Sequence, residues 1–171
     1  MLGRTAGELY WMFRQLERSE TTARLIEAGM RIALTRSAEV GDNWESVVTT
    51  AGQREAYLAL HADFDSASAI DFLLRNEANP SSVTQVMNSA RTNARAARTA
   101  LTREVWEAVN SAWMSVSGAL AAPVRQRDLP RVLGLIRHES AIVRGALVGT
   151  MLRNDTYNFS RLGTFVERTD N

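Results

Sequence analysis

The stretch that decides the fold is TAGELYWMFRQLERSETTARLIEAGMRIALTR, residues 5–36. Its apolar residues recur every three or four positions, the spacing that places side chains on one face of an α-helix. Thr5, followed three residues later by Glu8, has the pattern of a capping box, which marks a helix start. We therefore expect one helix from about Ala6 to Arg36, a length that suits a helical bundle. The residues of its apolar face are Leu9, Met12, Leu16, Ala23, Ile26, Met30 and Ala33.

Helical spacing continues through the rest of the chain, and no segment alternates apolar and polar residues as a strand does. Gly52 and Pro123 mark helix ends. Proline at the first position of a helix, as at Pro80, is a further start signal. The residues that we expect to cap the later helices are Asp42 or Asn43, Asn79, Thr102, Asp128 and Asp155. The sequence therefore predicts an all-α bundle of about six to seven helices in a single domain over residues 1–171.

The composition excludes several kinds of chemistry. The 171 residues contain no cysteine, which excludes disulfides, thiolate nucleophiles and zinc–cysteine sites. All 20 basic residues are arginine, so lysine cannot serve as a Schiff base, a general base or a phosphate-loop ligand. No apolar run is long enough to cross a bilayer, and the N-terminus lacks the apolar core of a secretory signal. We expect a cytoplasmic protein that is not embedded in a membrane.

Charge is distributed unevenly along the chain. Residues 37–79 contain eight acids and two arginines, whereas residues 80–138 contain eight arginines and three acids. Arg91, Arg95 and Arg98 follow one edge of a predicted helix, and we expect them to pair with the acidic segment. A phosphate or other anion site at these arginines is the alternative. Nucleic acid is disfavoured because the net charge is only +1 and no aromatic residues interleave with the arginines.

The chain also contains a possible internal repeat. Shifting the sequence by 150 residues aligns its first 21 residues with residues 151–171 without a gap. Glu17-Arg18 then meets Glu167-Arg168, and Glu20 meets Asp170. This offset predicts that the first and last helices are equivalent, and that a second repeat begins near residue 151.

Several segments together resemble the bacterial alpha-E family, named for predicted helices that bear a Glu-Arg motif. These segments are LYWMF and ERSETTAR near the start, NPSS, ARTNARAAR and TREVWEAVN in the middle, and FSRLGTFVERTDN at the end. Ser19, Thr92, Thr164 and Thr169 depart from the residues typical of the family. The resemblance implies that full members are about twice as long, so we expect this chain to be a shortened, N-terminal half. It also implies protein partners, namely a circularly permuted ATP-grasp ligase and a transglutaminase-like protein that form or modify peptides.

The two Glu-Arg motifs are the candidate site. On a helical wheel, Glu20 and Glu27 fall inside the apolar stripe of the first helix, so their charges need partners. Arg24 and Arg31 lie four residues further on, in the favourable orientation for such pairs. We expect a charge network that ties packed helices together. Its predicted members are Glu17, Arg18, Glu20, Arg24, Glu167, Arg168 and Asp170.

The alternative is a metal site built from Glu17, Glu20, Glu167 and Asp170. Four carboxylates in a helical bundle can hold a divalent cation, and with oxygen ligands alone Mg²⁺ or Mn²⁺ fits best. The Glu-x-x-His motif of di-iron bundles is missing, because Leu58 precedes His61 and Leu135 precedes His138 by three residues.

These patterns favour a non-catalytic module that assembles with protein partners or with itself, and no cofactor is predicted. An enzyme or metal protein that uses the clustered carboxylates is the alternative. We also expect the final helix, residues 155–171, to leave an apolar face uncovered as an interface. The four tryptophans, which follow helical spacing, are expected in the core. They are Trp11, Trp44, Trp106 and Trp113.

Overall fold

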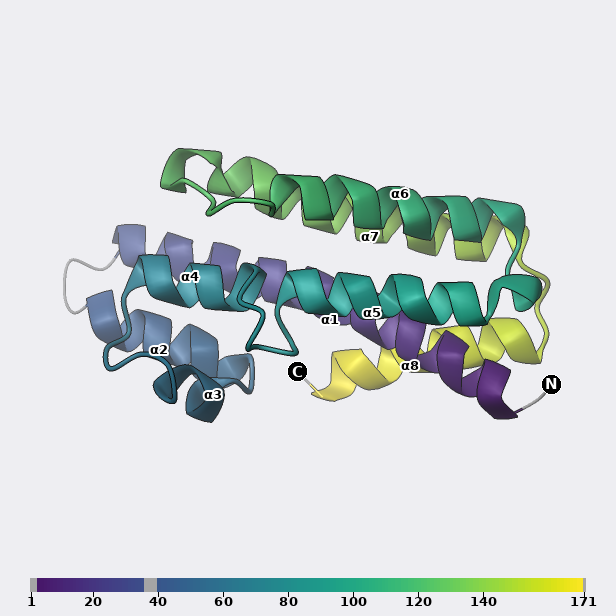
Figure 1. Cartoon of the computed structure of the whole chain (residues 1–171), viewed down its shortest axis with the longest axis horizontal. Coiled ribbons are helices and arrows are strands. Elements are labelled where there is room, and N and C mark those ends of the chain that lie inside the picture. The colour runs from purple at the N-terminus through teal and green to yellow at the C-terminus, as the bar shows by residue number, and fades with distance from the viewer. Residues whose placement is uncertain (1–2, 36–39, 171) are drawn as a thin grey trace.

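The computed structural model describes the backbone of residues 3–35 and 40–170 and the side chains of residues 3–34 and 43–170. Within these ranges the chain forms eight α-helices and no strand, which confirms the predicted all-α fold (Figure 1). The described residues thus form one helix more than the upper end of the expected six to seven. The helices are α1 (Gly3–Thr35), α2 (Val40–Thr50), α3 (Arg54–Leu58), α4 (Ser66–Leu74), α5 (Val83–Ala96), α6 (Arg103–Ala119), α7 (Leu129–Thr150) and α8 (Asp155–Asp170).

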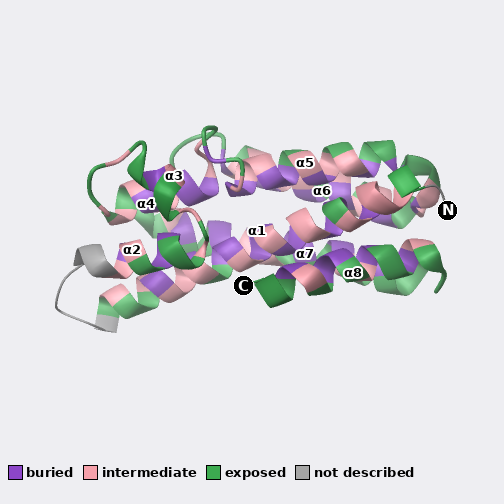
Figure 2. Ribbon diagram, turned by 90° about the horizontal axis from the view of Figure 1, so that it is seen from below, coloured by how far each residue is buried: buried purple, intermediate pink, exposed green. Residues whose placement is uncertain are grey.

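Helix α1 is the element around which the others are arranged. It contacts α5, α7 and α8 along its length and also packs against α2 and α4. In Figure 1, α2, α3 and α4 gather at one end of the molecule, and α8 lies beside α1 towards the other. Helices α6 and α7 lie side by side and close the bundle. The buried residues are on the inward sides of the helices (Figure 2).

The apolar face predicted for the first helix forms part of the core. Leu9, Met12, Leu16, Ala23 and Ile26 are buried, and Met30 packs partly buried against them. The periodicity of the apolar residues thus correctly predicted the inner face of this helix. None of the helices in the described part of the chain combines the length and apolar character of a membrane span.

The prediction that all four tryptophans lie in the core is wrong for Trp11. Trp44 is buried, whereas Trp106 and Trp113 are partly buried against the core. Trp11 is 46% exposed, meets the ring of Tyr10 edge-on, and lies 5.4 Å from the guanidinium of Arg14. Its position falls outside the stripe of α1, where a large amphipathic ring contacts a cation instead of the core.

Two of the predicted helix starts are confirmed. Thr102 precedes α6, and its hydroxyl accepts a hydrogen bond from the backbone N–H of Val105 at 3.4 Å. Asp128 precedes α7, which has Pro130 in its first turn, but the aspartate side chain makes no capping hydrogen bond and instead accepts from Arg125 at 2.8 Å. Gly52 adopts a positive φ of 69° just after α2, the left-handed conformation that terminates helices.

Other predicted caps are wrong because the helices begin elsewhere. Helix α1 begins at Gly3, before Thr5, and α2 begins at Val40, before both Asp42 and Asn43. The Asn43 amide instead donates to the backbone carbonyl of Gly29 at 2.8 Å. The side chain of Asp42 and residue Arg36, the expected end of the first helix, lie outside the described residues.

The capping predictions at Asn79 and Asp155 fail for a similar reason. Asn79 is buried, donates to the carbonyl of Phe72 at 3.0 Å, and accepts from the N–H of Ser81 at 2.9 Å. Its side chain thus fixes the loop that precedes α5, which begins three residues after Pro80. Asp155 is the first residue of α8, and the preceding Asn154 accepts from the N–H of Tyr157 at 3.4 Å.

Helices α1 and α8 approach each other closely at Gly163. A Cβ atom at this position would collide with the backbone carbonyl oxygen of Tyr10 and would lie 3.2 Å from the backbone nitrogen of Arg14. Because backbone atoms cannot rotate away as a side chain can, only glycine fits here without moving a helix.

We expect Gly163→Ala to lower the free energy of unfolding by about 1–3 kcal/mol, because overpacking outweighs the gain in helix propensity. Urea denaturation measures this effect. Gly134→Ala in α7 is the matched control, since a Cβ there meets nothing within 4 Å. The control should instead raise stability by about 0.5–1 kcal/mol, the usual difference between glycine and alanine inside a helix. Equal effects of the two substitutions would contradict the close approach.

Candidate functional site

The crossing of α1 and α8 brings the two Glu-Arg motifs into reciprocal ion pairs. Arg168 Nε donates to Glu17 Oε1 at 2.6 Å, and Arg18 Nε donates to Glu167 Oε1 at 2.6 Å. Arg18 also donates through Nη2 to Glu167 Oε2 at 2.9 Å, which makes that contact bidentate. Each motif therefore supplies the glutamate for the arginine of the other. We call these four residues the Glu-Arg clamp.

Further arginines connect the clamp to its surroundings. Arg14, one turn before Arg18 on α1, donates to Glu167 at 2.7 Å and also to Asp170. Arg144 of α7 donates to Glu20 and lies 3.5 Å from Glu17. Within α1, Arg24 donates to Glu20 at 2.7 Å. The clamp is thus part of a larger network that joins three helices.

The three glutamates of this network are deeply buried, whereas Asp170 is exposed. Glu17, Glu20 and Glu167 are 7%, 4% and 1% exposed. An unpaired carboxylate at such a depth would be costly, so the arginines are needed for the charged form to persist. The arginine heads remain partly in solvent, which lowers the cost of desolvating each pair.

The pKa values of Glu20 and Glu167 reflect this balance. Burial alone would raise the pKa of Glu167, but hydrogen bonds from Arg18 and Arg14 outweigh it and hold the pKa below its ordinary value of 4.5. Burial acts in the same way on Glu20, and hydrogen bonds from Arg144 and Arg24 again lower its pKa below that value. Both groups are carboxylates held ionised by guanidinium groups.

All seven residues predicted for the charge network lie within this cluster. The sequence interpretation missed Arg14 and Arg144. Arg14 could have been found, because it lies four residues before Arg18 and therefore on the same side of α1. No local signal pointed to Arg144, because its partners depend on which helix packs against α1. Glu27 likewise accepts from Arg137 of α7, and its predicted pairing with Arg31 stays a prediction.

The carboxylates of the metal alternative are the same ones that accept from arginine. Glu17, Glu20, Glu167 and Asp170 each have at least one guanidinium partner. A divalent cation at this position would therefore have to displace arginines and leave them near its own positive charge.

The predicted pairing of the Arg91 series with the acidic segment is wrong among the described residues. Arg91 donates to Asn110 at 2.9 Å, and its guanidinium lies 3.9 Å from the ring centre of Trp113. Arg98 lies 5.4 Å from Trp106, and Arg95 is exposed. The cause is that α5 packs mainly against α1 and α6, so tryptophans of α6 take the place expected for acids. The fold thus supplies aromatic neighbours that are distant in sequence.

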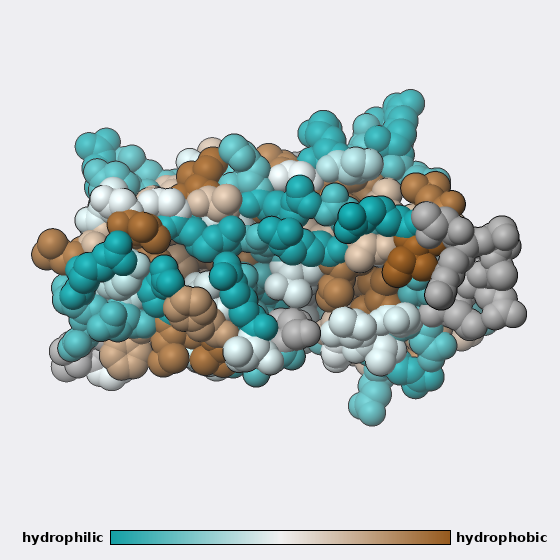
Figure 3. All heavy atoms as spheres, turned by 180° about the vertical axis from the view of Figure 1, so that it is seen from behind, coloured by the Kyte–Doolittle hydropathy of each residue, from teal (hydrophilic) through white to brown (hydrophobic). Residues whose placement is uncertain are grey.

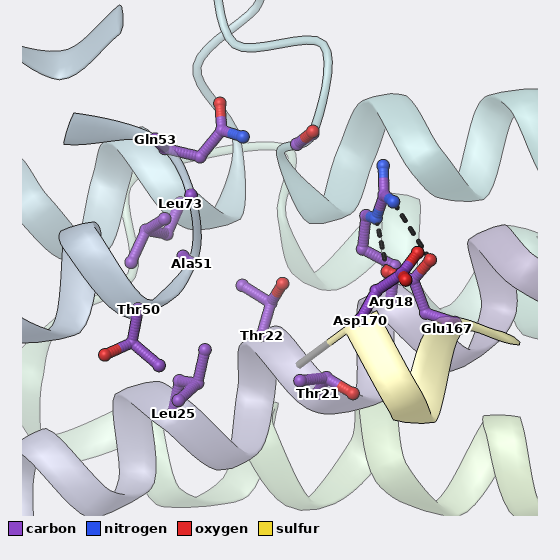
Figure 4. A pocket seen from close by; sticks show the side chains of 12 residues that line it. Arg18, Thr21, Thr22, Leu25, Thr50, Ala51, Gln53, Leu73, Glu167 and Asp170 are labelled. Atoms are coloured by element: carbon purple, nitrogen blue, oxygen red, sulfur yellow. Dashed lines mark hydrogen bonds and ion pairs between the residues drawn. The ribbon is translucent and has the colours of Figure 1, made fainter. Parts of the chain in front are cut away.

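A cavity of about 230 Å³ lies beside the clamp, between α1, the turn after α2 and the loop before α5 (Figure 4). Arg18 and Glu167 form one wall, and Leu25 of α1, Ala51 just after α2 and Leu73 of α4 contribute apolar surface to the opposite side. Most of its lining consists of hydroxyl, amide and apolar groups. The charged side chains at its edge, Arg18, Glu167 and Asp170, are already in ion pairs. The lining residues are Arg18, Thr21, Thr22, Leu25, Thr50, Ala51, Gly52, Gln53, Leu73, Ser81, Glu167 and Asp170.

We expect Glu167→Gln to lower the free energy of unfolding by about 3 kcal/mol, because it leaves two guanidinium groups facing a neutral amide. Urea denaturation at neutral pH measures the loss. The matched control is Glu107→Gln, which removes an exposed partner of Arg103 within α6. Exposed pairs of this kind contribute little, so the control should change stability by less than about 0.5 kcal/mol. Similar values for both variants would show that the clamp does not hold the helices.

Stability should also depend on pH through these carboxylates. Their folded-state pKa values lie below the ordinary value of 4.5, so the ionised groups stabilise the fold fully above that pH. This stabilisation is lost as the pH falls through the lowered pKa values. The urea midpoint should therefore drop in this acidic range. The drop should be smaller in Glu167→Gln, which has one such carboxylate fewer. An equally large drop of the urea midpoint with pH in that variant would contradict the assignment of the effect to Glu167.

The comparisons with known proteins place this sequence in a family. No curated protein and no solved structure matches the sequence. The profile of the Alpha-E family, described as a predicted alpha-helical domain with a conserved ER motif, matches residues 1–171. The Glu-Arg dipeptide of that description occurs twice in the chain, and its two copies form the clamp. Because the match extends over the whole sequence, the chain belongs to the Alpha-E family.

Proposed function

We propose that this chain is a non-catalytic helical assembly module of the cytoplasm. It acts with a circularly permuted ATP-grasp-type peptide ligase and a transglutaminase-like protein, the partners that the family resemblance implies. The clamp fixes α8 on α1, so that the outer side of α8 is presented to partners in one orientation. The observation that carries the proposal is that the carboxylates of both Glu-Arg motifs are paired with arginines of the same chain.

The protonation state of the buried carboxylates supports a structural role. A general acid at neutral pH needs a raised pKa, as buried catalytic glutamates have. Here the pKa values of Glu20 and Glu167 are lowered instead. Such groups stay ionised and hydrogen bonded throughout the physiological range, which suits attachment of helices better than proton transfer.

Co-expression with the ATP-grasp-type ligase and the transglutaminase-like protein of the same genome tests the proposal. Size-exclusion chromatography with light scattering should show a complex of defined stoichiometry. Glu167→Gln should weaken this complex, because it loosens α8, whereas Glu107→Gln should leave it intact. Separate elution of all three proteins at micromolar concentration would count against the proposal.

The metal alternative is distinguished by elemental analysis of protein purified without chelator. We expect a metal content far below one ion per chain in the wild-type protein. A stoichiometric metal that is lost in Glu20→Gln would favour a carboxylate-based metal protein. The anion alternative predicts a salt-sensitive rise in melting temperature with polyphosphate that Arg95→Ala abolishes.

A further inference from the structure

Helix α8 carries an apolar seam that is left in solvent. Phe159, Leu162 and Val166 follow the spacing of three and four residues that is typical of helix-packing seams. Phe159 and Leu162 are 38% and 48% exposed, and Val166 is partly exposed. At the offset that aligns the two Glu-Arg motifs, the matching residues of α1 are Leu9, Met12 and Leu16.

The two seams have opposite environments. Leu9 and Met12 are fully buried and Leu16 is 3% exposed, because α5 and α7 cover α1. The same kind of seam on α8 has no helix over it within the described residues. Contiguous apolar patches on the surface of a soluble protein mark interaction sites. Its helical spacing indicates that the missing partner element is a helix.

A groove that offers the partner a place to insert side chains lies on the α7 side of α8, bordered by Phe165, which is about 60° round the helix from Leu162. It has a volume of about 410 Å³ and lies between α7 and α8. Val148 of α7 and Phe165 of α8, 45% and 47% exposed, form part of its apolar surface. Leu147 and the small Gly145 also line it. Figure 3 shows hydrophobic and hydrophilic side chains interspersed on the end of the molecule that contains α8.

The charges around the groove indicate the chemistry of the partner. Three arginines line it, and of these Arg144 and Arg168 pair with acids of α1. Arg161 instead lies 4.6 Å from the ring of Phe165 and donates to the Tyr157 hydroxyl at 3.4 Å. Arg153 also donates to that hydroxyl. Among the described residues, neither Arg153 nor Arg161 pairs with a carboxylate, so this face has positive charge available to a partner.

We infer that the face formed by α7 and α8 binds an acidic amphipathic α-helix of a partner protein. Apolar side chains of that helix cover Leu162 and Phe165 and enter the groove beside Val148. Glutamate or aspartate residues beside its apolar stripe pair with Arg153 and Arg161, as flanking charges do in coiled coils. This inference rests on the proposed assembly function and names the surface and the partner chemistry that would serve it.

The test uses two synthetic helical peptides that share a leucine seam and differ only in flanking residues, all glutamate in one and all lysine in the other. Fluorescence anisotropy measures their binding to the full chain. The glutamate peptide should bind with a dissociation constant at least about ten-fold lower, a difference of about 1.4 kcal/mol. Added salt should reduce this difference, since screening weakens exposed ion pairs.

Two variants locate the binding site. Arg161→Glu should reverse the preference between the peptides, because it turns an attractive charge into a repulsive one. Phe165→Ser should weaken binding of both peptides by removing apolar surface. The matched control is Arg95→Glu, which makes the same charge change at an exposed residue of α5. It should leave both affinities unchanged, and melting temperatures should show that all three variants fold.

Equal binding of both peptides, or no saturable binding of the glutamate peptide, would overturn the inference. A dimer of the chain that dissociates in Phe165→Ser would also overturn it, by making a second copy the occupant. These outcomes are separable from failure of the proposed function. If the ligase complex forms but Arg161→Glu leaves it intact and the peptides do not bind, assembly uses another surface. If no complex forms, the peptide result still decides the chemistry of this face.

Discussion

The paired charge of Glu167 is the interaction on which the attachment of α8 depends. The residues that α8 buries are Tyr157, Ser160, Gly163, Thr164 and Glu167, of which only the tyrosine is large and largely apolar. Such a face contributes little hydrophobic stabilisation, because that stabilisation grows with the apolar area removed from water. The helix is held instead by two guanidinium groups on one buried carboxylate and by the close backbone contact at Gly163. Without the ion pairs, the small residues would not keep it in place.

The exclusive use of arginine is well matched to this kind of contact. A guanidinium group is planar and presents parallel N–H groups, so it can meet both oxygens of one carboxylate, as Arg18 does with Glu167. It can also bind an acid while stacking on a ring, as Arg14 does near Trp11. A lysine would supply the charge but not the fixed direction of the bonds. Replacement by lysine would therefore retain the net charge and lose the geometry of the clamp.

Local patterns predicted the helices and the buried stripe of α1 because both follow from the 3.6-residue period. They also found seven of the residues in the charge network, since charges that fall within an apolar stripe must have partners. Local patterns could not predict the side-chain partners that depend on which helices pack together. Asn43 and Asn79 looked like caps, yet their amides bind carbonyls of other segments. Arg144 reaches the network only because α7 lies against α1, and Arg91 meets Trp113 only because α6 lies against α5. The internal repeat itself stays a prediction, although its two Glu-Arg pairs meet in space.

The contact at Gly163 also separates two tasks within a single helix. Sliding α8 by one turn would bring Phe159 or Glu167 against the Tyr10 carbonyl. The glycine therefore fixes both the position of α8 along α1 and its rotation about its own axis. The residues that lock this register face inward, and the residues of the exposed seam face outward. Substitutions on the outer side can therefore accumulate without weakening the contact between α8 and α1. In evolutionary terms, the residues on the outer side of α8 are free to change while the residues that attach the helix to α1 stay the same.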